Sequence, residues 1–367
     1  MIDKLNPLLI GDLEIKIPIV QGGMGLKVST ASLVSAVANC GGAGTIASVG
    51  LGFGTELNEV DFVKASREAL QRQIRSAKEL SKGVIGVNVL TALNNYEDLV
   101  RTAIYEKADF IVSGAGLPLR LPEFAENSSA KLIPIVSSGR AASIIIKSWK
   151  KRYNCIPDAF VVEGPLAGGH LGFSFEDLLI LDKNPLEELV KEVIDVVSVY
   201  EKELGVSIPV IAAGGIFDGK DIARFLKMGA KGVQLATRFV PTFECDVSDK
   251  FKELYIAAKE SDIVTIKSPV GMPARAVKTK LVEDVLKGKR EIIKCNYRCL
   301  KTCNPGTTPY CIMHALYNAV LGNMDKAVVF AGKNVTKVNK IVSVKELMDE
   351  LVFETVEEMN GCHQACL

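Results

Sequence analysis

The chain has no excess of either charge and is poor in aromatic residues. Its 367 residues include 44 lysines and arginines and 43 acidic residues, which leaves a net charge of +1. Balanced charge argues against binding to nucleic acid or to an anionic membrane surface. Aromatic residues make up only 6% of a sequence that is 48% hydrophobic. The core therefore consists mainly of valine, isoleucine, leucine and alanine, as buried parallel sheets prefer.

Long hydrophobic runs are also missing. No apolar run is long enough to cross a bilayer, and the first residues lack the charged-then-apolar layout of a secretion signal. We therefore expect a soluble cytoplasmic protein. Its length allows one large α/β domain or two smaller ones.

Cysteine is present but too sparse for a disulfide scaffold, with nine residues in the whole chain. In a reducing cytoplasm, clustered cysteines indicate metal binding or redox chemistry. Cys295, Cys299, Cys303 and Cys311 form such a cluster, and a helix over residues 292–303 would place the first three on one face. Four thiolates suit an iron–sulfur cluster or a zinc ion. Buried free thiols are the alternative interpretation.

Short apolar runs alternate with amphipathic stretches along most of the chain. The apolar runs occupy residues 17–20, 44–48, 84–90, 110–113, 132–137, 159–162, 209–213 and 232–236. The amphipathic stretches occupy residues 32–39, 60–80, 96–105, 141–151, 185–204, 220–228 and 249–259, with apolar residues three or four apart. Eight strands, each followed by a helix, predict an α/β fold of the (β/α)8 TIM barrel type. An open doubly wound sheet is the alternative.

The predicted domain organisation follows from a change in composition near residue 280. We assign residues 1–280 to the barrel and residues 281–367 to a helical, cysteine-containing extension packed on it. Residues 267–276, which contain proline and glycine, form a loop after the last barrel helix that is expected to cover the pocket. Arg275 in this loop either attracts an anion or is a solvated charge.

Residues 163–172 carry the most informative motif. His170, one of three histidines, stands behind Gly168 and Gly169, just after an apolar run. Function in parallel α/β folds collects where strands end, and glycines there allow close approach of a flat ligand. A histidine supplies a proton or a hydrogen bond near neutral pH. A glycine turn with a packed histidine is the alternative.

The last two predicted strands end in a pattern that suits phosphate. Gly214 and Gly215 follow the seventh run, and Ala236 and Thr237 follow the eighth. This is the usual phosphate-binding place of a TIM barrel, because exposed backbone N–H groups there suit a dianion. Two tight turns without a ligand are the alternative.

Six motifs occur in an order that resembles one family. They are Gln-Gly-Gly-Met-Gly at 21–25, Gly-Val-Asn-Val at 86–89, Ser-Gly-Ala-Gly at 113–116, Ala-Gly-Gly-His at 167–170, Ala-Ala-Gly-Gly-Ile at 212–216 and Gly-Val-Gln-Leu-Ala-Thr-Arg-Phe at 232–239. Together they resemble the nitronate monooxygenase (2-nitropropane dioxygenase) family. These are FMN-dependent barrels related to the flavin-dependent enoyl-ACP reductases. The resemblance covers roughly residues 8–280.

The resemblance implies a set of site residues. The FMN phosphate would lie at Gly214, Gly215, Ala236 and Thr237, and the isoalloxazine and ribityl groups at Gly22, Gly23, Met24 and Asn88. Further flavin contacts are implied for Glu163, Gly168, Gly169, Gln234 and Leu235. His170 matches the active-site histidine, and Ser113, Ala115 and Gly116 would form part of the substrate wall.

The sequence departs from the family pattern near His170. Nitronate monooxygenases commonly carry glutamine where Glu163 stands, whereas the enoyl reductases carry Glu-Gly. Both groups usually place glutamate before Ala-Gly-Gly-His, where this chain has Leu166. The local charge of the loop is therefore altered, and both subgroups stay open.

Three functions follow as hypotheses. The first is oxidation of alkyl nitronates with O2, in which protonated His170 holds an anionic nitronate or neutral His170 removes the α-proton of a nitroalkane. The second is NAD(P)H-dependent reduction of an enoyl thioester, with NAD(P)H as a further partner. The third is a phosphate-ligand-binding barrel without turnover. A homodimer is an open alternative for the assembly.

Overall fold

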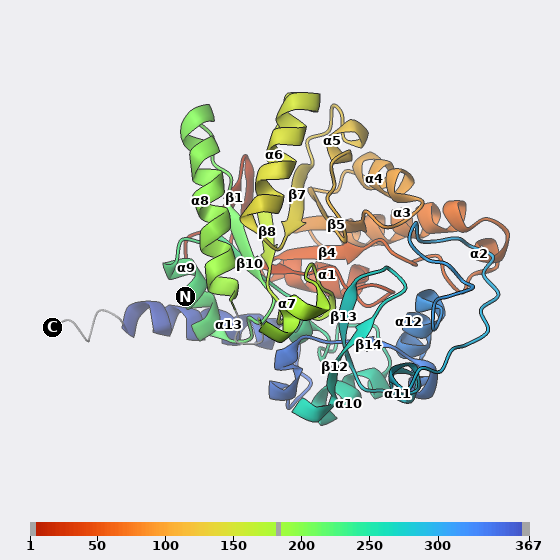
Figure 1. The fold of residues 1–367 in the computed structure, drawn as a ribbon. Helices are drawn as coiled ribbons and strands as arrows, with labels where there is room; N and C mark the ends of the chain where they lie inside the picture. Colours follow the sequence, from red (N-terminus) through yellow and green to blue (C-terminus); the bar gives the residue numbers. More distant parts are fainter. Residues whose placement is uncertain (1–4, 181–184, 362–367) are drawn as a thin grey trace.

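Eight parallel strands close into a barrel at the centre of the computed structural model, which describes residues 5–180 and 185–361. Their order is β10-β11-β3-β4-β5-β6-β7-β8, and Figure 1 shows the barrel strands surrounded by helices. Closure occurs between β11 and β3, where Val233 pairs with Ile19. The strands are β3 (Ile19–Gln21), β4 (Ala43–Ala47), β5 (Val84–Leu90), β6 (Phe110–Gly114), β7 (Lys131–Val136), β8 (Phe160–Glu163), β10 (Val210–Ala213) and β11 (Gly232–Leu235). The barrel prediction is confirmed, and the open-sheet alternative is wrong.

Helices cover the outside of the barrel. They include α1 (Ala31–Asn39), α2 (Glu56–Val60), α3 (Phe62–Leu80), α4 (Tyr96–Tyr105), α5 (Leu121–Phe124), α6 (Gly139–Tyr153), α7 (Phe175–Ile180), α8 (Leu186–Leu204) and α9 (Gly219–Lys227). Side-chain caps begin several of them: Asp61 accepts from the first turn of α3, Ser138 from that of α6 and Asp218 from that of α9. Such caps satisfy backbone N–H groups that lack a partner within the helix.

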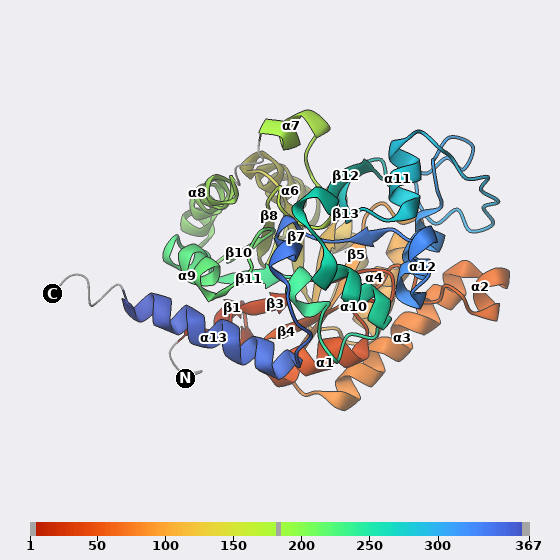
Figure 2. The same cartoon turned by 90° about the horizontal axis from the view of Figure 1, so that it is seen from below.

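The helix ring is completed by the end of the chain. Residues 249–259 form α10 (Asp249–Ala257) as expected, but it is α13 (Val344–Gly361) that packs against both α9 and α1 (Figure 2). Glu354 of α13 accepts a hydrogen bond of 2.8 Å from the backbone N–H of Gly219, and Glu350 pairs with Arg238 at 2.7 Å. The segment after the predicted boundary at residue 280 is therefore packed closely against residues before that boundary.

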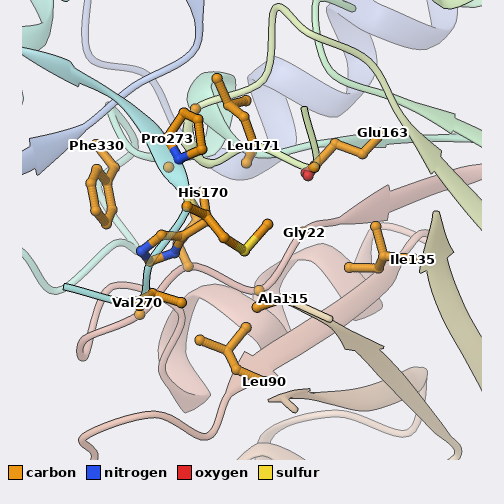
Figure 3. A pocket seen from close by; sticks show the side chains of 18 of the residues that line it. Gly22, Leu90, Ala115, Ile135, Glu163, His170, Leu171, Val270, Pro273 and Phe330 are labelled. Atoms are coloured by element: carbon orange, nitrogen blue, oxygen red, sulfur yellow. The ribbon is translucent and has the colours of Figure 1, made fainter. Parts of the chain in front are cut away.

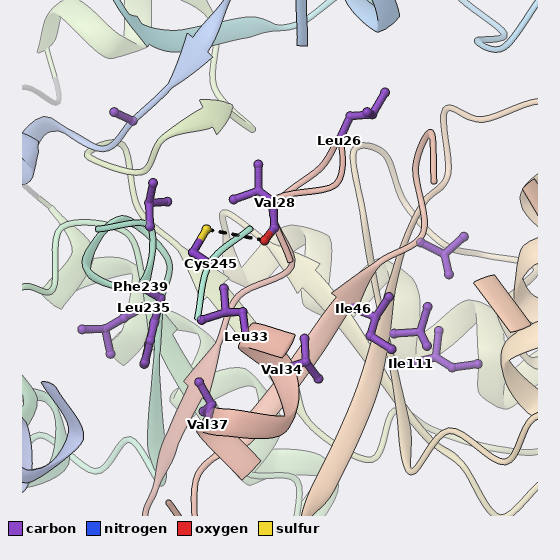
Figure 4. Packing of buried hydrophobic residues seen from close by; sticks show 14 of the residues in the cluster. Leu26, Val28, Leu33, Val34, Val37, Ile46, Ile111, Leu235, Phe239 and Cys245 are labelled. Carbon is purple, nitrogen blue, oxygen red and sulfur yellow. Dashed lines mark hydrogen bonds between the residues drawn. The ribbon is translucent and has the colours of Figure 1, made fainter. Parts of the chain in front are cut away.

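Two hydrophobic clusters hold the barrel together. One lies between strands and helices, where side chains of α1 such as Leu33 and Val37 pack with residues of neighbouring strands (Figure 4). The other fills the barrel interior and includes Phe110 together with Leu8 and Ile10. Leu8 and Ile10 belong to an antiparallel hairpin of β1 (Leu8–Ile10) and β2 (Leu13–Ile15), so this hairpin packs onto the interior of the barrel.

A second sheet stands beside the barrel. It joins β12 (Ile263–Lys267) and β13 (Pro273–Val277) with β9 (Gly169–His170) and β14 (Val329–Phe330). The loop expected at residues 267–276 is thus a hairpin, and its turn covers the pocket. Neither expectation for Arg275 holds: the side chain is 6% exposed and donates to the carbonyl oxygens of Pro165 and Ala167. It therefore holds the loop that precedes His170.

The rest of the extension contains α11 (Lys280–Leu286), α12 (Ile312–Leu321), two short 3-10 helices (Met324–Lys326 and Lys333–Lys337) and α13. The helix considered for residues 292–303 is absent, because this segment instead pairs with the loop after β5. Leu300 forms a β-bridge with Leu93, and the carbonyl of Cys299 accepts from the backbone N–H of Asn94. Within the described ranges, no helix is long and apolar enough to cross a membrane.

Candidate active site

A cavity of about 820 Å³ opens where the carboxyl ends of the barrel strands meet the second sheet. Its wall brings together most of the predicted site, although these residues are spread over more than two hundred positions of the sequence. The predicted residues in the wall are Gly22, Gly23, Met24, Asn88, Ala115, Gly116, Glu163, Gly168, Gly169, His170, Gln234, Ala236 and Thr237. The remaining wall is mainly apolar and includes Leu90, Ile135, Val270 and Phe330 (Figure 3).

A small compartment of about 60 Å³ adjoins the large cavity and shares Glu163, Gly168, Gln234, Ala236 and Thr237 with it. Gly214, Gly215 and Leu235 line only this compartment. Gly214 and Gly215 have φ angles of +87° and +101°, which side chains rarely adopt. The predicted phosphate loops therefore do meet, at the ends of β10 and β11.

The extension closes this small compartment with residues that the sequence analysis missed. Asn334 donates from its side-chain amide to the carbonyl of Gly215 at 2.6 Å, and the N–H of Gly332 donates to Thr237 Oγ1 at 3.1 Å. An Ala-Gly-Lys-Asn stretch at 331–334 was a local signal for a turn. Nothing in the sequence indicated that this turn reaches the barrel rim.

Glu163 and His170 are two ionisable groups of the cavity wall whose pKa values are shifted by burial. Burial raises the pKa of Glu163 to about 7 and lowers the pKa of His170 to about 4, because a low-dielectric site disfavours charge. At neutral pH His170 is therefore a neutral imidazole. Its ring packs edge-to-face on Phe330, with centroids 5.2 Å apart.

One predicted wall residue lies elsewhere. Ser113 is fully buried, and its hydroxyl is bonded to the Tyr96 hydroxyl at 2.8 Å and to the Val89 carbonyl at 3.0 Å. These contacts place it behind the wall and correct the prediction, whereas Ala115 and Gly116 do line the cavity. The Ser-Gly-Ala-Gly motif gave no information on which residue faces inward.

The four cysteines of the extension gather behind the cavity wall. Cys299 interacts electrostatically with Cys295, Cys303 and Cys311, and the neighbouring residues Leu300 and Ile312 line the cavity. Within residues 5–180 and 185–361, however, no group of three His, Cys, Asp or Glu side chains is arranged to hold a metal ion. The structure thus gives no support to a zinc ion on these cysteines, and the iron–sulfur alternative stays a prediction.

Comparison with known proteins identifies relatives whose names describe different activities. A sequence profile described as nitronate monooxygenase matches residues 6–354. A (3aS,4S,5R,7aS)-5-hydroxy-7a-methyl-1-oxo-octahydro-1H-indene-4-carboxyl-CoA dehydrogenase of Mycobacterium tuberculosis is 32% identical over 273 residues, covering 74% of this chain and 66% of the relative. The chain thus spans just under two thirds of that relative's length. A probable nitronate monooxygenase of Staphylococcus aureus is 27% identical over 300 residues, covering 74% of this chain and 78% of the relative.

Two solved structures have a similar fold. FabK from Thermotoga maritima superimposes with a TM-score of 0.74 at 27% identity and covers 96% of both chains. A nitroalkane oxidase from Streptomyces ansochromogenes has a TM-score of 0.72 at 20% identity, covering 94% of this chain and 97% of its own, and shows the shared fold. Because the profile matches nearly the whole chain and the chain folds as a closed barrel, the chain belongs to the nitronate monooxygenase family of oxidoreductases.

Proposed function

We propose that the chain binds FMN and oxidises alkyl nitronates with O2. The observation that carries this proposal is the continuous wall between the phosphate-sized compartment and His170, made by Gly168 and Gly169. A ligand with its phosphate in the small compartment would extend into the large cavity beside the imidazole. This is the shape of a flavin nucleotide with room for a substrate.

Two glycines of the wall are required by the close packing of the protein around the cavity. A Cβ atom on Gly23 would come within 2.5 Å of the side chain of Asn88, and one on Gly168 within 2.5 Å of the backbone at Ala331. The phosphate would be held by Gly214, Gly215, Ala236 and Thr237, with Asn334 beside them. The rings and ribityl chain would lie along Gly22–Met24, Asn88 and Gln234.

Bound FMN would supply the electron-accepting ring, and the protein supplies placement and electrostatics. A nitronate is already deprotonated, so its recognition needs hydrogen-bond donors rather than a base. Neutral His170 carries one ring N–H and can donate it to a nitro oxygen. The apolar side chains of the wall reduce the access of water and strengthen that contact.

Anaerobic reduction of the flavin tests the proposal. Protein loaded with FMN should bleach on addition of propyl-2-nitronate and recover its colour when air is admitted. Bleaching by NADH or NADPH but not by the nitronate would contradict it.

Substitution of the histidine tests its role. His170→Ala should keep the flavin spectrum and lose on the order of 10²–10³ in the rate of bleaching, since it removes the hydrogen-bond donor proposed to face the nitro oxygens. Val199→Ala is a suitable control, because Val199 is 61% exposed on the outer helix α8. Unchanged bleaching in His170→Ala would remove the histidine from the chemistry.

An enoyl-thioester reductase that uses NAD(P)H is the second candidate. It is favoured by Glu163, by the likeness to FabK and by the apolar wall, which includes Leu117, Phe173 and Leu300. The bleaching experiment separates the two, because rapid reduction by NADPH supports the reductase. Purified protein that cannot be loaded with any flavin would favour the third candidate, a barrel that binds a phosphate ligand without turnover.

A further inference from the structure

The turn between β12 and β13 places a serine directly against the histidine. His170 pairs with Ala274 in the β9–β13 ladder, so the turn that precedes β13 folds over the imidazole. Ser268 Oγ lies 2.7 Å from His170 Nε2, and Ser268 is only 2% exposed. A bond this short in a buried position fixes the ring and occupies Nε2.

The turn itself is held in place by its own backbone and by the extension. Gly271 N–H donates to the Ser268 carbonyl at 2.9 Å, and Ser268 N–H donates to the Met272 carbonyl at 3.0 Å. Thr302 of the extension donates through Oγ1 to the Val270 carbonyl at 2.7 Å. The position of Ser268 is therefore set by segments on both sides of the cavity.

Behind Ser268 lies a tyrosine with an unused hydroxyl. Tyr310 is fully buried, and its hydroxyl has no hydrogen bond within 3.5 Å. Ser268 lies near enough to this hydroxyl to affect the pKa of Tyr310, although burial has the larger effect. A buried hydroxyl without a partner is unfavourable, so a small closing movement toward Ser268 would stabilise this arrangement.

The direction of the Ser268–His170 bond follows from counting donors and acceptors. A serine oxygen offers one hydrogen and two lone pairs. The N–H of Val270 occupies one lone pair at 3.2 Å, and Tyr310, whose hydroxyl has no other partner, would donate into the other lone pair after this closing movement. The hydroxyl hydrogen of Ser268 is then left for His170 Nε2, and the proton of the neutral imidazole resides on Nδ1.

We propose that Ser268, backed by Tyr310, is a positioning residue that locks His170 in its Nδ1–H form, so that the imidazole acts as a hydrogen-bond donor toward the substrate and not as a base. This inference rests on the proposed use of the same site. It assigns the substrate to compounds that accept a hydrogen bond and need no proton removed by the imidazole, such as a nitronate or a thioester, and not to neutral nitroalkanes that must first lose a proton.

Two-bond proton–nitrogen NMR of the flavin-loaded protein, labelled with ¹⁵N-histidine, reads the tautomer without any turnover. His170→Gln identifies the His170 signals among those of the three histidines. We expect the Nδ1–H pattern in the unsubstituted protein, and a shift of more than half of the population to the Nε2–H form in Ser268→Ala. An Nε2–H pattern in the unsubstituted protein, or no change in Ser268→Ala, would overturn the proposal.

Tyr310→Phe tests the second part with little loss of volume. We expect a mixture of the two tautomers, because Ser268 can then accept from Nε2–H. Tyr96→Phe is the matched control, since Tyr96 is also a buried tyrosine but its hydroxyl is bonded to Ser113 behind the wall at 2.8 Å. An unchanged pattern in Tyr310→Phe, or an equal change in Tyr96→Phe, would remove Tyr310 from the arrangement.

Kinetics separate this inference from the proposed function. If the tautomer is as expected and nitronate bleaches the flavin, Ser268→Ala should lower the bleaching rate by at least about tenfold, and neutral nitroalkane should bleach poorly in the unsubstituted protein. If the tautomer is as expected and no nitronate reacts, the positioning role stands and the proposed substrate fails. Faster bleaching by neutral nitroalkane than by its nitronate would contradict the donor role.

Discussion

At the scale of single residues, burial decides which protonation states the cavity contains. Glu163 and His170 lie in one apolar wall. Burial keeps Glu163 protonated, and therefore neutral, to a higher pH than usual. It keeps His170 unprotonated, and therefore neutral, to a lower pH than usual. A glutamine in place of Glu163 would be neutral at every pH. The glutamate therefore gives this cavity a charge that appears only near and above neutrality.

Glu163→Gln should change how stability depends on pH. The folded protein keeps the Glu163 proton up to about pH 7, whereas the unfolded chain releases it near pH 4.5, so stability is lost as pH rises through this window. The flavin-free variant should be less stable relative to the unsubstituted protein at about pH 5 than at about pH 8, as measured by urea unfolding. Glu253→Gln, at an exposed position, is the control, and identical pH profiles for all three proteins would argue against the raised pKa.

Gly168→Ala should weaken FMN binding by at least about tenfold. The added Cβ would lie 2.5 Å from the backbone of Ala331 and Gly332, and must push this turn away from the small compartment. Fluorescence titration with FMN measures the effect. Gly361→Ala is the control, because nothing lies within 4 Å of a Cβ there. Equal FMN affinities of Gly168→Ala and Gly361→Ala would show that the turn at Ala331 and Gly332 can shift without weakening FMN binding.

At the scale of elements, the extension is part of the barrel rather than an attachment. Helix α13 fills the ring between α9 and α1, β14 extends the second sheet through β13, and Gly332 and Asn334 close the small compartment. The site needs both halves of the chain in place.

Leu351→Ala should therefore destabilise the whole protein and not α13 alone. Leu351 is fully buried, and such a truncation costs about 2–5 kcal/mol. We expect one urea transition, detected equally by circular dichroism and by release of flavin, at a lower midpoint. Met359→Ala, at a side chain that is 37% exposed, should change stability by less than about 0.5 kcal/mol. A separate early transition for α13 would contradict this account.

At the scale of the whole molecule, a bound nucleotide would join segments from Gly22 to Asn334. Ligand present at about 1,000 times its Kd stabilises the folded state by about 4 kcal/mol. FMN should therefore raise the melting temperature more than riboflavin, which lacks the phosphate. Asn334→Ala should reduce the advantage of FMN and leave the riboflavin shift unchanged, and equal shifts for both ligands would speak against the phosphate subsite.

Local patterns in the sequence were enough for the barrel and for most of the cavity wall. Strands such as Val84–Leu90 and helices such as Tyr96–Tyr105 have the predicted bounds, because their residues encode burial and period without help from distant contacts. The glycines at strand ends could be assigned to one site since closure of a barrel brings all those ends to one rim.

Residue patterns along the chain were thus sufficient to predict a barrel, its rim and a histidine on that rim. Three-dimensional packing excluded a helix at residues 292–303, placed Ser113 behind the wall and brought Ser268 against His170. These features depend on contacts between distant parts of the chain or on which way a side chain faces, and neither leaves a period in the local sequence.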